Sequence, residues 1–250
     1  MFRPCIDLHE GRVKQIVGGT LSDSAGGPQT NYVSDRPASW YAELYRKDDL
    51  RGGHVIQLGP GNKTAAREAL AAFPGGLQLG GGVTGDNAAQ WLDAGASHVI
   101  VTSWVFREGR LDAERLAALV KSIGRERLVL DLSCRQRDDQ YWVVTNRWQS
   151  FTELPVNEAT MKTLAASCAE FLVHAVDVEG QQTGIDLALV QTLAAGSPLP
   201  VTYAGGANAL ADLDAVQTAS GGRVHLTIGS ALDIFGGKLK YTDCVTFNHR

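Results

Sequence analysis

Long hydrophobic runs, clusters of one charge and paired cysteines are all missing from this 250-residue sequence. No stretch of about 18 apolar residues could span a membrane, and charges at positions 3, 7, 10 and 12 interrupt any signal peptide. The 23 basic residues are outnumbered by 27 acidic ones and form no long run, so nucleic acid and anionic membranes are not expected partners. These absences predict a cytoplasmic protein.

Cysteine is scarce and scattered. Cys5, Cys134, Cys168 and Cys244 are far apart and form no CxxC pair. This spacing disfavours a disulfide framework and a zinc site alike, so four free thiols and no metal are expected. The formal net charge of −4 also means that an anionic substrate needs local recognition.

What the chain does have is the size and pattern of one barrel. About 250 residues is typical of a (β/α)₈ fold, and we expect a single domain over residues 1–250. Short apolar runs, as expected of strands buried on both faces, alternate with amphipathic stretches. The expected strands are Pro4–Leu8, His54–Leu58, Leu77–Leu79, His98–Val101, Arg127–Leu132, Phe171–Ala175, Pro200–Tyr203 and Val224–Ile228. The expected helices include Thr64–Phe73, Leu111–Ile123, Ile185–Ala195 and Leu210–Thr218. Eight such units favour a closed α/β barrel over an open doubly wound sheet.

Two segments interrupt this alternation. Gly11–Asn31 and Arg135–Thr152 are predicted to be long loops that follow strands one and five. Loops of this length in a compact barrel are usually functional. We expect the second loop to be mobile without substrate and ordered with it.

The two halves of the chain also resemble each other. Three features recur at about half the chain length: Asp7 and Asp131, Gly80-Gly81-Gly82 and Ala204-Gly205-Gly206, and Thr102-Ser103 and Gly229-Ser230. The first two pairs are 124 positions apart, and Ser103 and Ser230 are 127 apart. This repeat predicts two similar (β/α)₄ half-barrels.

Asp7 and Asp131 are the first candidate catalytic residues. Both lie near carboxyl ends of predicted strands, where (β/α)₈ barrels place their active sites. A buried aspartate is rare unless it is paired, liganding or catalytic, although two carboxylates that cap backbone amides remain an alternative. Two opposed carboxylates suit proton transfer, with one as general base and the other as general acid.

Glycine-rich strand ends predict two phosphate sites. One set is Gly205, Gly206, Gly229 and Ser230; its repeat is Gly81, Gly82, Thr102 and Ser103. Glycine lets backbone N–H groups approach an anion closely, although ordinary turns explain most of the 28 glycines. Two phosphates with carboxylates between them imply an elongated bisphosphate substrate.

At the level of whole motifs, the chain resembles a known family. The segments CIDLHEGRVKQIVGGT, LGGGV, VIVTSW, VLDLSCR, FLVHAVDVEG, YAGGA and LTIGSALDIFGG are similar to the phosphoribosylformimino-aminoimidazole carboxamide ribotide isomerases of histidine biosynthesis, in their eukaryotic-type branch. The resemblance covers essentially the whole chain. It implies an Amadori rearrangement of an aminoaldose to an aminoketose, without a cofactor and without an obligate protein partner.

The resemblance also implies roles for single residues. Asp7 would be the base that takes the sugar C2 proton, and Asp131 the acid that assists ring opening. His174 stands where the family often has threonine, before Asp177 and Glu179. It would orient or polarise the sugar, or else be a satisfied barrel histidine.

Further substrate contacts are expected from the two long segments. Trp148 resembles a loop tryptophan that stacks on the aminoimidazole ring, with a structural loop anchor as the alternative. Arg135 or Arg147 would reach polar substrate groups. Lys14 would steady a phosphate or Asp7, or else stay solvated. Gly19 belongs to a segment that matches the isomerases and is expected to contact substrate.

Two other functions remain open from the sequence. One is the cyclase subunit of imidazole glycerol phosphate synthase, which needs ammonia and a glutaminase partner. The other is a non-catalytic phosphosugar-binding barrel, against which the presence of both aspartates argues. Acceptance of phosphoribosylanthranilate as a further substrate is also open.

Overall fold

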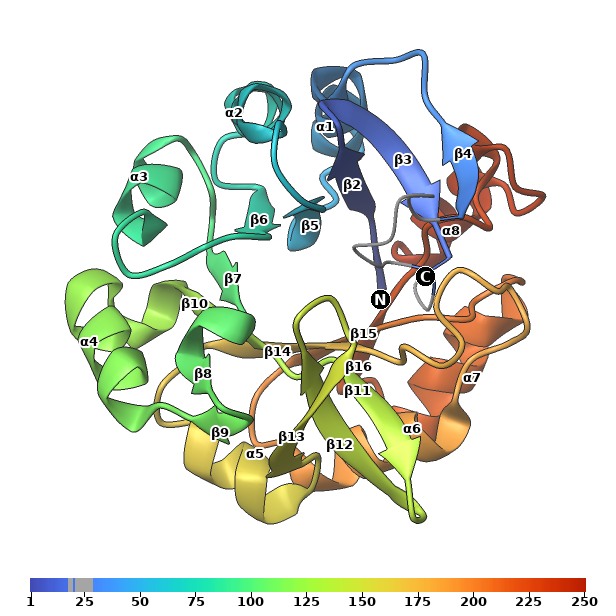
Figure 1. Cartoon of the computed structure of the whole chain (residues 1–250). Coiled ribbons are helices and arrows are strands. Elements are labelled where there is room, and N and C mark those ends of the chain that lie inside the picture. Colours follow the sequence, from blue (N-terminus) through green and yellow to red (C-terminus); the bar gives the residue numbers. More distant parts are fainter. Residues whose placement is uncertain (18–19, 21–28) are drawn as a thin grey trace.

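A ring of parallel strands forms the centre of the computed structural model, which describes residues 1–17, 20 and 29–250 (Figure 1). All eight expected strands are present, each within one residue of its predicted ends. They are β2 (Cys5–His9), β5 (Gly53–Gln57), β6 (Leu77–Gly80), β7 (Val99–Val101), β10 (Leu128–Asp131), β14 (Glu170–His174), β15 (Val201–Ala204) and β16 (Val224–Thr227), with the short β1 (Phe2–Arg3) ahead of β2.

The N-terminal segment closes the ring. Pro4 separates β1 from β2, and the two strands pair with different neighbours. β1 runs parallel to β16 and β2 runs parallel to β5, while the Pro4 carbonyl still accepts a hydrogen bond of 3.1 Å from His54 N. First and last strands are thereby joined, and the prediction of a (β/α)₈ barrel is confirmed.

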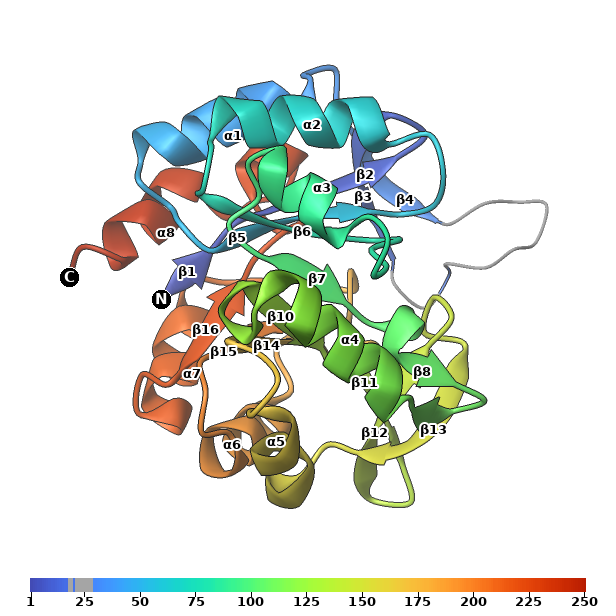
Figure 2. The same cartoon turned by 90° about the vertical axis from the view of Figure 1, so that its left-hand side faces the viewer.

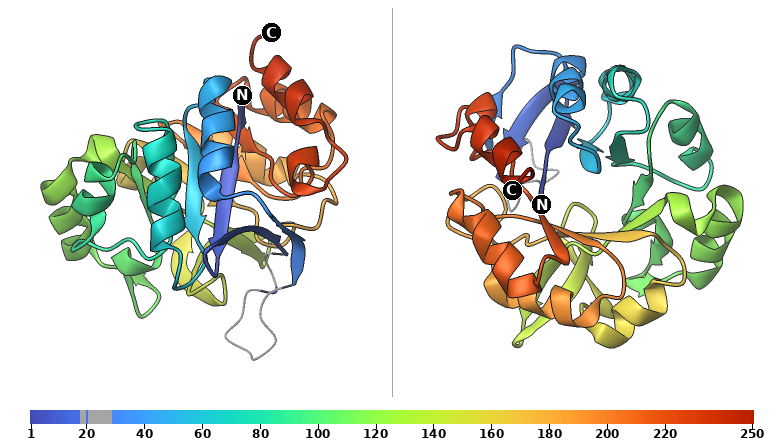
Figure 3. Two further views of the ribbon diagram at one scale, coloured as in Figure 1. Left: turned by 90° about the horizontal axis from the view of Figure 1, so that it is seen from above. Right: turned by 180° about the vertical axis from the view of Figure 1, so that it is seen from behind.

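Helices surround the strands (Figures 1 and 3). They are α1 (Ala38–Lys47), α2 (Lys63–Ala72), α3 (Ala88–Asp93), α4 (Ala113–Ile123), α5 (Glu158–Leu164), α6 (Leu187–Gly196), α7 (Ala211–Ser220) and α8 (Tyr241–Phe247). α4 shows why such a segment is helical: the Asp112 side chain caps its N-terminus, Leu116 and Leu119 are buried on one face, and Gly124 ends it at φ +79°. α2, α4, α6 and α7 correspond to the four expected helices.

The second segment predicted as a loop is mostly β-structure, so that expectation was wrong, and the described part of the first segment also contains strands. Gly11–Asn31 contains β3 (Arg12–Ile16) and the start of β4 (Thr30–Val33), which pair antiparallel. Arg135–Thr152 lies within a separate three-stranded sheet of β11 (Cys134–Arg137), β12 (Gln140–Thr145) and β13 (Ser150–Pro155). A small hairpin of β8 (Phe106–Arg107) and β9 (Arg110–Leu111) lies beside them. Figure 2 shows these additions at the end of the barrel opposite the chain termini.

The barrel interior is filled. Ile56, Ile100, Val129 and Leu172 pack together inside it, separately from the main core between strands and helices. Below them Glu170 forms an ion pair with Arg3 and accepts hydrogen bonds from Gln78 and Thr202. Ligands can therefore reach only the mouth of the barrel, as is usual in this fold.

The four cysteines are buried and unpaired. Within the described ranges, no helix is both long and apolar enough to cross a membrane.

Candidate active site

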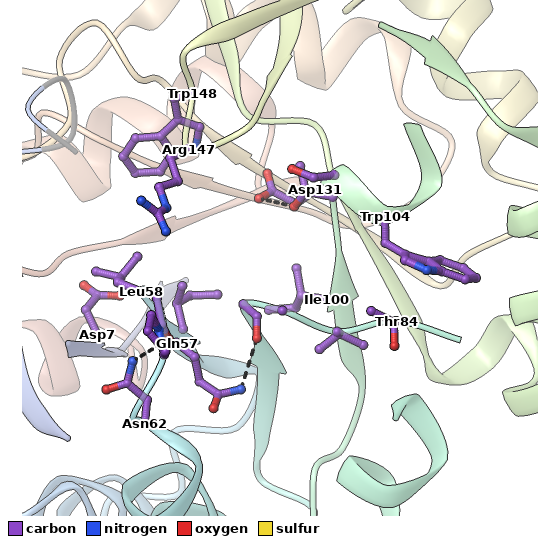
Figure 4. Close-up of a pocket in the computed structure, with 18 of the residues that line it drawn as sticks. Asp7, Gln57, Leu58, Asn62, Thr84, Ile100, Trp104, Asp131, Arg147 and Trp148 are labelled. Carbon is purple, nitrogen blue, oxygen red and sulfur yellow. Dashed lines mark hydrogen bonds between the residues drawn. The ribbon is translucent and has the colours of Figure 1, made fainter. Parts of the chain in front are cut away.

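Two chambers meet at the mouth of the barrel. The larger has a volume of about 740 Å³ and extends over the ends of β2, β5, β6, β7 and β10 (Figure 4). The smaller, about 30 Å³, lies over the ends of β15 and β16. Asp7, His174 and Glu179 line both chambers. Three titratable side chains thus occupy the junction.

Asp7, near the end of β2, has an unusually basic carboxyl group. Its Oδ2 accepts a hydrogen bond of 3.2 Å from Gln15 Nε2, on the neighbouring strand β3. Burial, and secondly the negative charge of Glu179, raise the pKa of Asp7 to about 7. A carboxyl group with this pKa can both take up and release a proton near neutral pH, as a general base or acid requires.

Asp131, at the end of β10, is held as a carboxylate. Its Oδ1 accepts from the Ser133 backbone N (2.7 Å) and from the Ser133 hydroxyl, and its Oδ2 accepts from Thr102 Oγ1 (2.9 Å). Although burial alone would raise its pKa, His174 and the Ser133 hydrogen bonds bring the pKa below its usual value. A lowered pKa favours the carboxylate form of Asp131, and the acid role expected for this residue stays a prediction.

The pKa of His174, at the end of β14, is shifted in the opposite direction. Its Nδ1 lies 3.0 Å from Ser133 Oγ and 4.0 Å from Asp131 Oδ1. Burial would lower its pKa, but the carboxylate of Asp131 outweighs burial and raises it. The pKa values of Asp131 and His174 are therefore shifted in opposite directions, which favours a carboxylate on Asp131 and a proton on the His174 imidazole.

Glu179 joins this group without having been singled out in the sequence. Its Oε2 is buried and has no hydrogen-bond partner within the described part of the chain. Burial raises its pKa, and the charge of His174 opposes that effect. The sequence showed an acidic residue five positions after His174, but only the fold shows that its side chain turns back toward Asp7.

The first expected phosphate set lines the larger chamber: Gly81, Gly82, Thr102 and Ser103 all border it. Gly81 has φ +87°, and a Cβ there would lie 2.1 Å from the Gln57 carbonyl oxygen, so this glycine is required for packing. Gly82 has φ +68°, and a Cβ there would meet nothing within 4 Å. The backbone at Gly82 is therefore open to a ligand.

The second expected set, Gly205, Gly206, Gly229 and Ser230, lines the smaller chamber. A strap, residues 175–186 between β14 and α6, covers it: Gln182 Nε2 donates to Ser230 O at 2.9 Å, and Gly184 N donates to Gly206 O at 2.9 Å. The remaining 30 Å³ holds about two water molecules. The two predicted phosphate sites thus differ in this structure, and only the first is open.

Trp148 and Arg147 enter the larger chamber from the turn between β12 and β13 (Figure 4). Asn146, Arg147 and Trp148 have φ of +54°, +55° and +66°, three successive side-chain-bearing residues in the left-handed region. Such conformations are strained and are found at functional sites. The turn is attached to the first glycine-rich set, since Asn146 N donates to Ser103 Oγ at 3.1 Å.

Other expected contacts lie elsewhere. Lys14 Nζ donates to Glu10 at 2.6 Å and lines neither chamber, and Arg135 Nε donates to Asp177 at 2.7 Å outside both. Arg147, the alternative to Arg135, is the arginine that the fold places at the chamber. Gly19 lies outside the described residues.

Across residues 1–17, 20 and 29–250, the structure contains no group of three or more His, Cys, Asp or Glu side chains that could hold a metal ion.

The model of the family described as "Histidine biosynthesis protein" matches residues 1–240. A chloroplastic 1-(5-phosphoribosyl)-5-((5-phosphoribosylamino)methylideneamino) imidazole-4-carboxamide isomerase, HISN3, of Medicago truncatula is 53% identical over 255 residues, which cover 100% of this chain and 82% of that protein. Isomerases of the same name from Neurospora crassa (53% over 253 residues) and Saccharomyces cerevisiae (49% over 257 residues) each align with 100% of this chain and 98% of their own length. Together with the confirmed barrel, these matches show that the chain belongs to the histidine biosynthesis protein family.

Proposed function

We propose that this protein is the isomerase that converts the phosphoribosylformimino aminoaldose of 5-aminoimidazole-4-carboxamide ribotide into its phosphoribulosyl aminoketose. The observation that carries the proposal is a pair of adjoining chambers, bordered by the two glycine-rich sets of strand ends, with Asp7 and the Asp131–His174 pair between them. The similar proteins are named as isomerases of this substrate, and none of those cited is named as a cyclase.

The reaction needs one proton donor and one proton acceptor. In the first step the C1–oxygen bond of the ribose ring breaks, its electron pair goes to the ring oxygen, and that oxygen takes a proton from the Asp131–His174 side. The amino nitrogen supplies the electron pair that forms a C1=N bond. In the second step Asp7 removes the C2 proton, the C–H electrons form a C1=C2 bond, and the electron pair of the C1=N bond returns to nitrogen. The resulting enolamine becomes the aminoketose when C1 takes up a proton and the C2 hydroxyl loses one. No electron enters or leaves, so no redox cofactor is required.

The pKa values suit these roles. Asp7 must be ionised to accept the C2 proton, and with a pKa of about 7 it is ionised for about half of the molecules at neutral pH. The Asp7 carboxylate is then a stronger base than that of an ordinary aspartate, and the ionised half of the molecules can accept the C2 proton. The imidazolium of His174, stabilised by Asp131, supplies the first proton.

The ends of the substrate would occupy the two glycine-rich sets. We place one phosphate at Gly82 and Ser103, in the open chamber, and the other at Gly205, Gly206 and Ser230 after the strap has moved. The imidazole ring would stack on Trp148, and closure of this turn would exclude water from the open-chain imine. A structure with substrate tests the placement: two phosphates at these sets support it, and a single phosphate or one placed elsewhere contradicts it.

The deciding experiment is an assay of the purified chain alone with the aminoaldose, following formation of the aminoketose. We expect turnover without added cofactor, metal or second protein. Phosphoribosylanthranilate should be tested in parallel, because the barrel residues alone do not decide whether it is accepted. No turnover of the aminoaldose by the folded chain would refute the proposed function.

We also propose that the enzyme acts in the cytoplasm, as its sequence predicts, although the Medicago truncatula relative is chloroplastic. Cell fractionation with an antibody to the chain tests this location.

A further inference from the structure

Ser133 occupies a special position between Asp131 and His174. It follows β10 by two residues, is completely buried and lies against the end of β14. Its backbone N donates to Asp131 Oδ1 in a tight Asx-type turn, and its backbone O accepts from Val144 N at 2.9 Å. Hydrogen bonds thus fix both the backbone N and the backbone O of Ser133. The direction of its hydroxyl proton depends on the polar atoms around Oγ.

The hydrogen bonds of this hydroxyl are complete. A serine hydroxyl has one proton to donate and two lone pairs that accept. Ser133 Oγ donates its proton to Asp131 Oδ1. It accepts from the backbone N of His174 at 3.3 Å, and His174 Nδ1 lies 3.0 Å away at the remaining lone pair.

This arrangement leaves His174 Nδ1 only one role. Because the proton of Ser133 is already given to Asp131, Nδ1 must carry a proton of its own and donate it to Oγ. Nε2 has no hydrogen-bond partner in the described ranges, and His174 borders both chambers. Nε2 is therefore the ring nitrogen that remains for a substrate.

We propose that Ser133 is a positioning residue that holds His174 in the Nδ1–H form, so that Nε2–H of the imidazolium, and not Asp131, protonates the ring oxygen of the substrate. The inference rests on the proposed isomerase function. The proton passes from Nε2 to the ring oxygen as the C1–oxygen bond breaks, which leaves a neutral imidazole with its proton on Nδ1. Asp131 stays a carboxylate throughout and stabilises the charged state.

Several groups act on the charge of His174. Asp131 comes from β10, Asp7 from β2 and Glu179 from the strap, and each carboxylate favours the imidazolium. The His54 ring on β5 lies 5.8 Å from the His174 ring, edge to face, and burial lowers the pKa of His54 to about 3, so it stays neutral. The Trp148 ring lies 5.5 Å away on another side. Within this surrounding, Ser133 contributes the neutral acceptor that selects which nitrogen is protonated.

The tautomer can be measured directly. In protein with ¹⁵N-labelled histidine, long-range ¹H–¹⁵N spectra of the substrate-free enzyme distinguish Nδ1–H from Nε2–H, and a His174→Asn variant identifies the His174 signals. Above the pKa of His174 we expect the neutral ring to keep its proton on Nδ1 in the wild type. In Ser133→Ala we expect a mixture or a change to Nε2–H. A neutral wild-type ring protonated on Nε2 would overturn the inference.

Kinetics give a second, independent readout. Ser133→Ala should lower kcat by about tenfold or more with KM changed less than about threefold, since a misdirected proton donor affects the transition state. We expect activity to fall at high pH as the donor loses its proton, and we expect this limb of the pH profile to move to lower pH in Ser133→Ala. Ser133→Thr keeps the hydroxyl and should restore both properties. If Ser133→Thr does not fold, the tautomer measured in the wild type is the deciding test.

Ser220→Ala is the matched control. Ser220 is also buried and its hydroxyl donates to Val216 O at 2.7 Å, but it lies at the end of α7, away from the chambers. Kinetics of Ser133→Ala equal to those of Ser220→Ala would overturn the positioning role. The proposed function fails separately, if the wild type does not convert the aminoaldose, whereas the tautomer is measured without substrate.

Discussion

Replacing Asp7 by asparagine should remove activity and at the same time stabilise the fold. Asparagine keeps the shape and an oxygen that accepts the bond from Gln15. It has no ionisable carboxyl group, so it cannot take the C2 proton. We expect turnover to fall on the order of a hundredfold or more, the scale of general acid–base catalysis. In the wild type, kcat/KM should fall about tenfold per pH unit below a pH of about 7, as Asp7 becomes protonated.

The gain in stability follows from the raised pKa. Folding moves the pKa of Asp7 from 3.8 to about 7, so the native state binds this proton more tightly than the unfolded chain. The difference amounts to about 4 kcal/mol, at about 1.36 kcal/mol per pKa unit. Because the side chain keeps some contact with solvent, we expect about half of this, on the order of 2 kcal/mol.

The sign and the pH window are specific. The native state loses stability as pH rises from 3.8, where the unfolded carboxyl ionises, to about 7, where the native one does. Asp7→Asn should therefore match the wild type near pH 4 and be more stable at pH 8, by about 4–8 °C in Tm. Scanning calorimetry at pH 4, 6 and 8 measures this trend.

Asp131→Asn is the internal control with the opposite sign. Asp131 has a lowered pKa, so its carboxylate stabilises the fold above the usual aspartate pKa, and that contribution is lost as pH falls through the native pKa. The Asp131→Asn variant should be less stable than the wild type at pH 8. Equal stability of Asp7→Asn and wild type at pH 8, or near-normal turnover of Asp7→Asn, would refute the reasoning about Asp7.

Three further substitutions, together with two control substitutions, test the substrate contacts. Trp148→Ala should weaken substrate binding by about 1–3 kcal/mol, on the scale of base–aromatic stacking; unchanged KM and kcat would leave Trp148 as a structural loop anchor. Arg147→Ala should raise KM. Arg135→Ala and Lys14→Ala should change KM less than about twofold, because these side chains lie outside the chambers. A larger rise in KM for Arg135→Ala or Lys14→Ala than for Arg147→Ala would contradict the placement of Arg147 at the substrate. Gly82→Ala should fold, because a Cβ at this position meets nothing within 4 Å. It should nevertheless raise KM, because the added methyl group crowds the bound phosphate and strains the backbone at positive φ. An unchanged KM would place the phosphate elsewhere.

The barrel was predictable because its strands carry a local signal. A strand covered by helices outside and by the packed interior inside must be apolar on both faces, and runs such as Leu128–Asp131 show this directly. α1 also carried a signal, since Ala38, Tyr41, Ala42 and Tyr45 are buried at helical spacing. The short α3 and α5 have six and seven residues, too few to show a clear period.

The antiparallel sheet that forms where the second loop was predicted shows the limit of local patterns. Gln140–Thr145 alternates poorly, because part of it packs on the barrel mouth and part faces solvent. Its pairing with β11 and β13 satisfies the backbone groups that a loop would leave to water. The same pairing sets the turn that carries Trp148 into the chamber, where Arg147 and Trp148 adopt left-handed conformations that their own propensities disfavour.

The sequence by itself determined the architecture and the location of the chemistry. Alternating strands and helices specify the barrel, and the repeat of 124 residues puts Asp7 and Asp131 on strands one and five, at one end. Only the tertiary structure decided where the proton resides, which phosphate site is open and which arginine reaches the chamber. These properties depend on burial and on neighbours distant in the chain: His174 beside Asp131, Glu179 beside Asp7, and the strap over Ser230. A pKa responds to charges within a few ångströms, and the order of residues along the chain does not specify those distances.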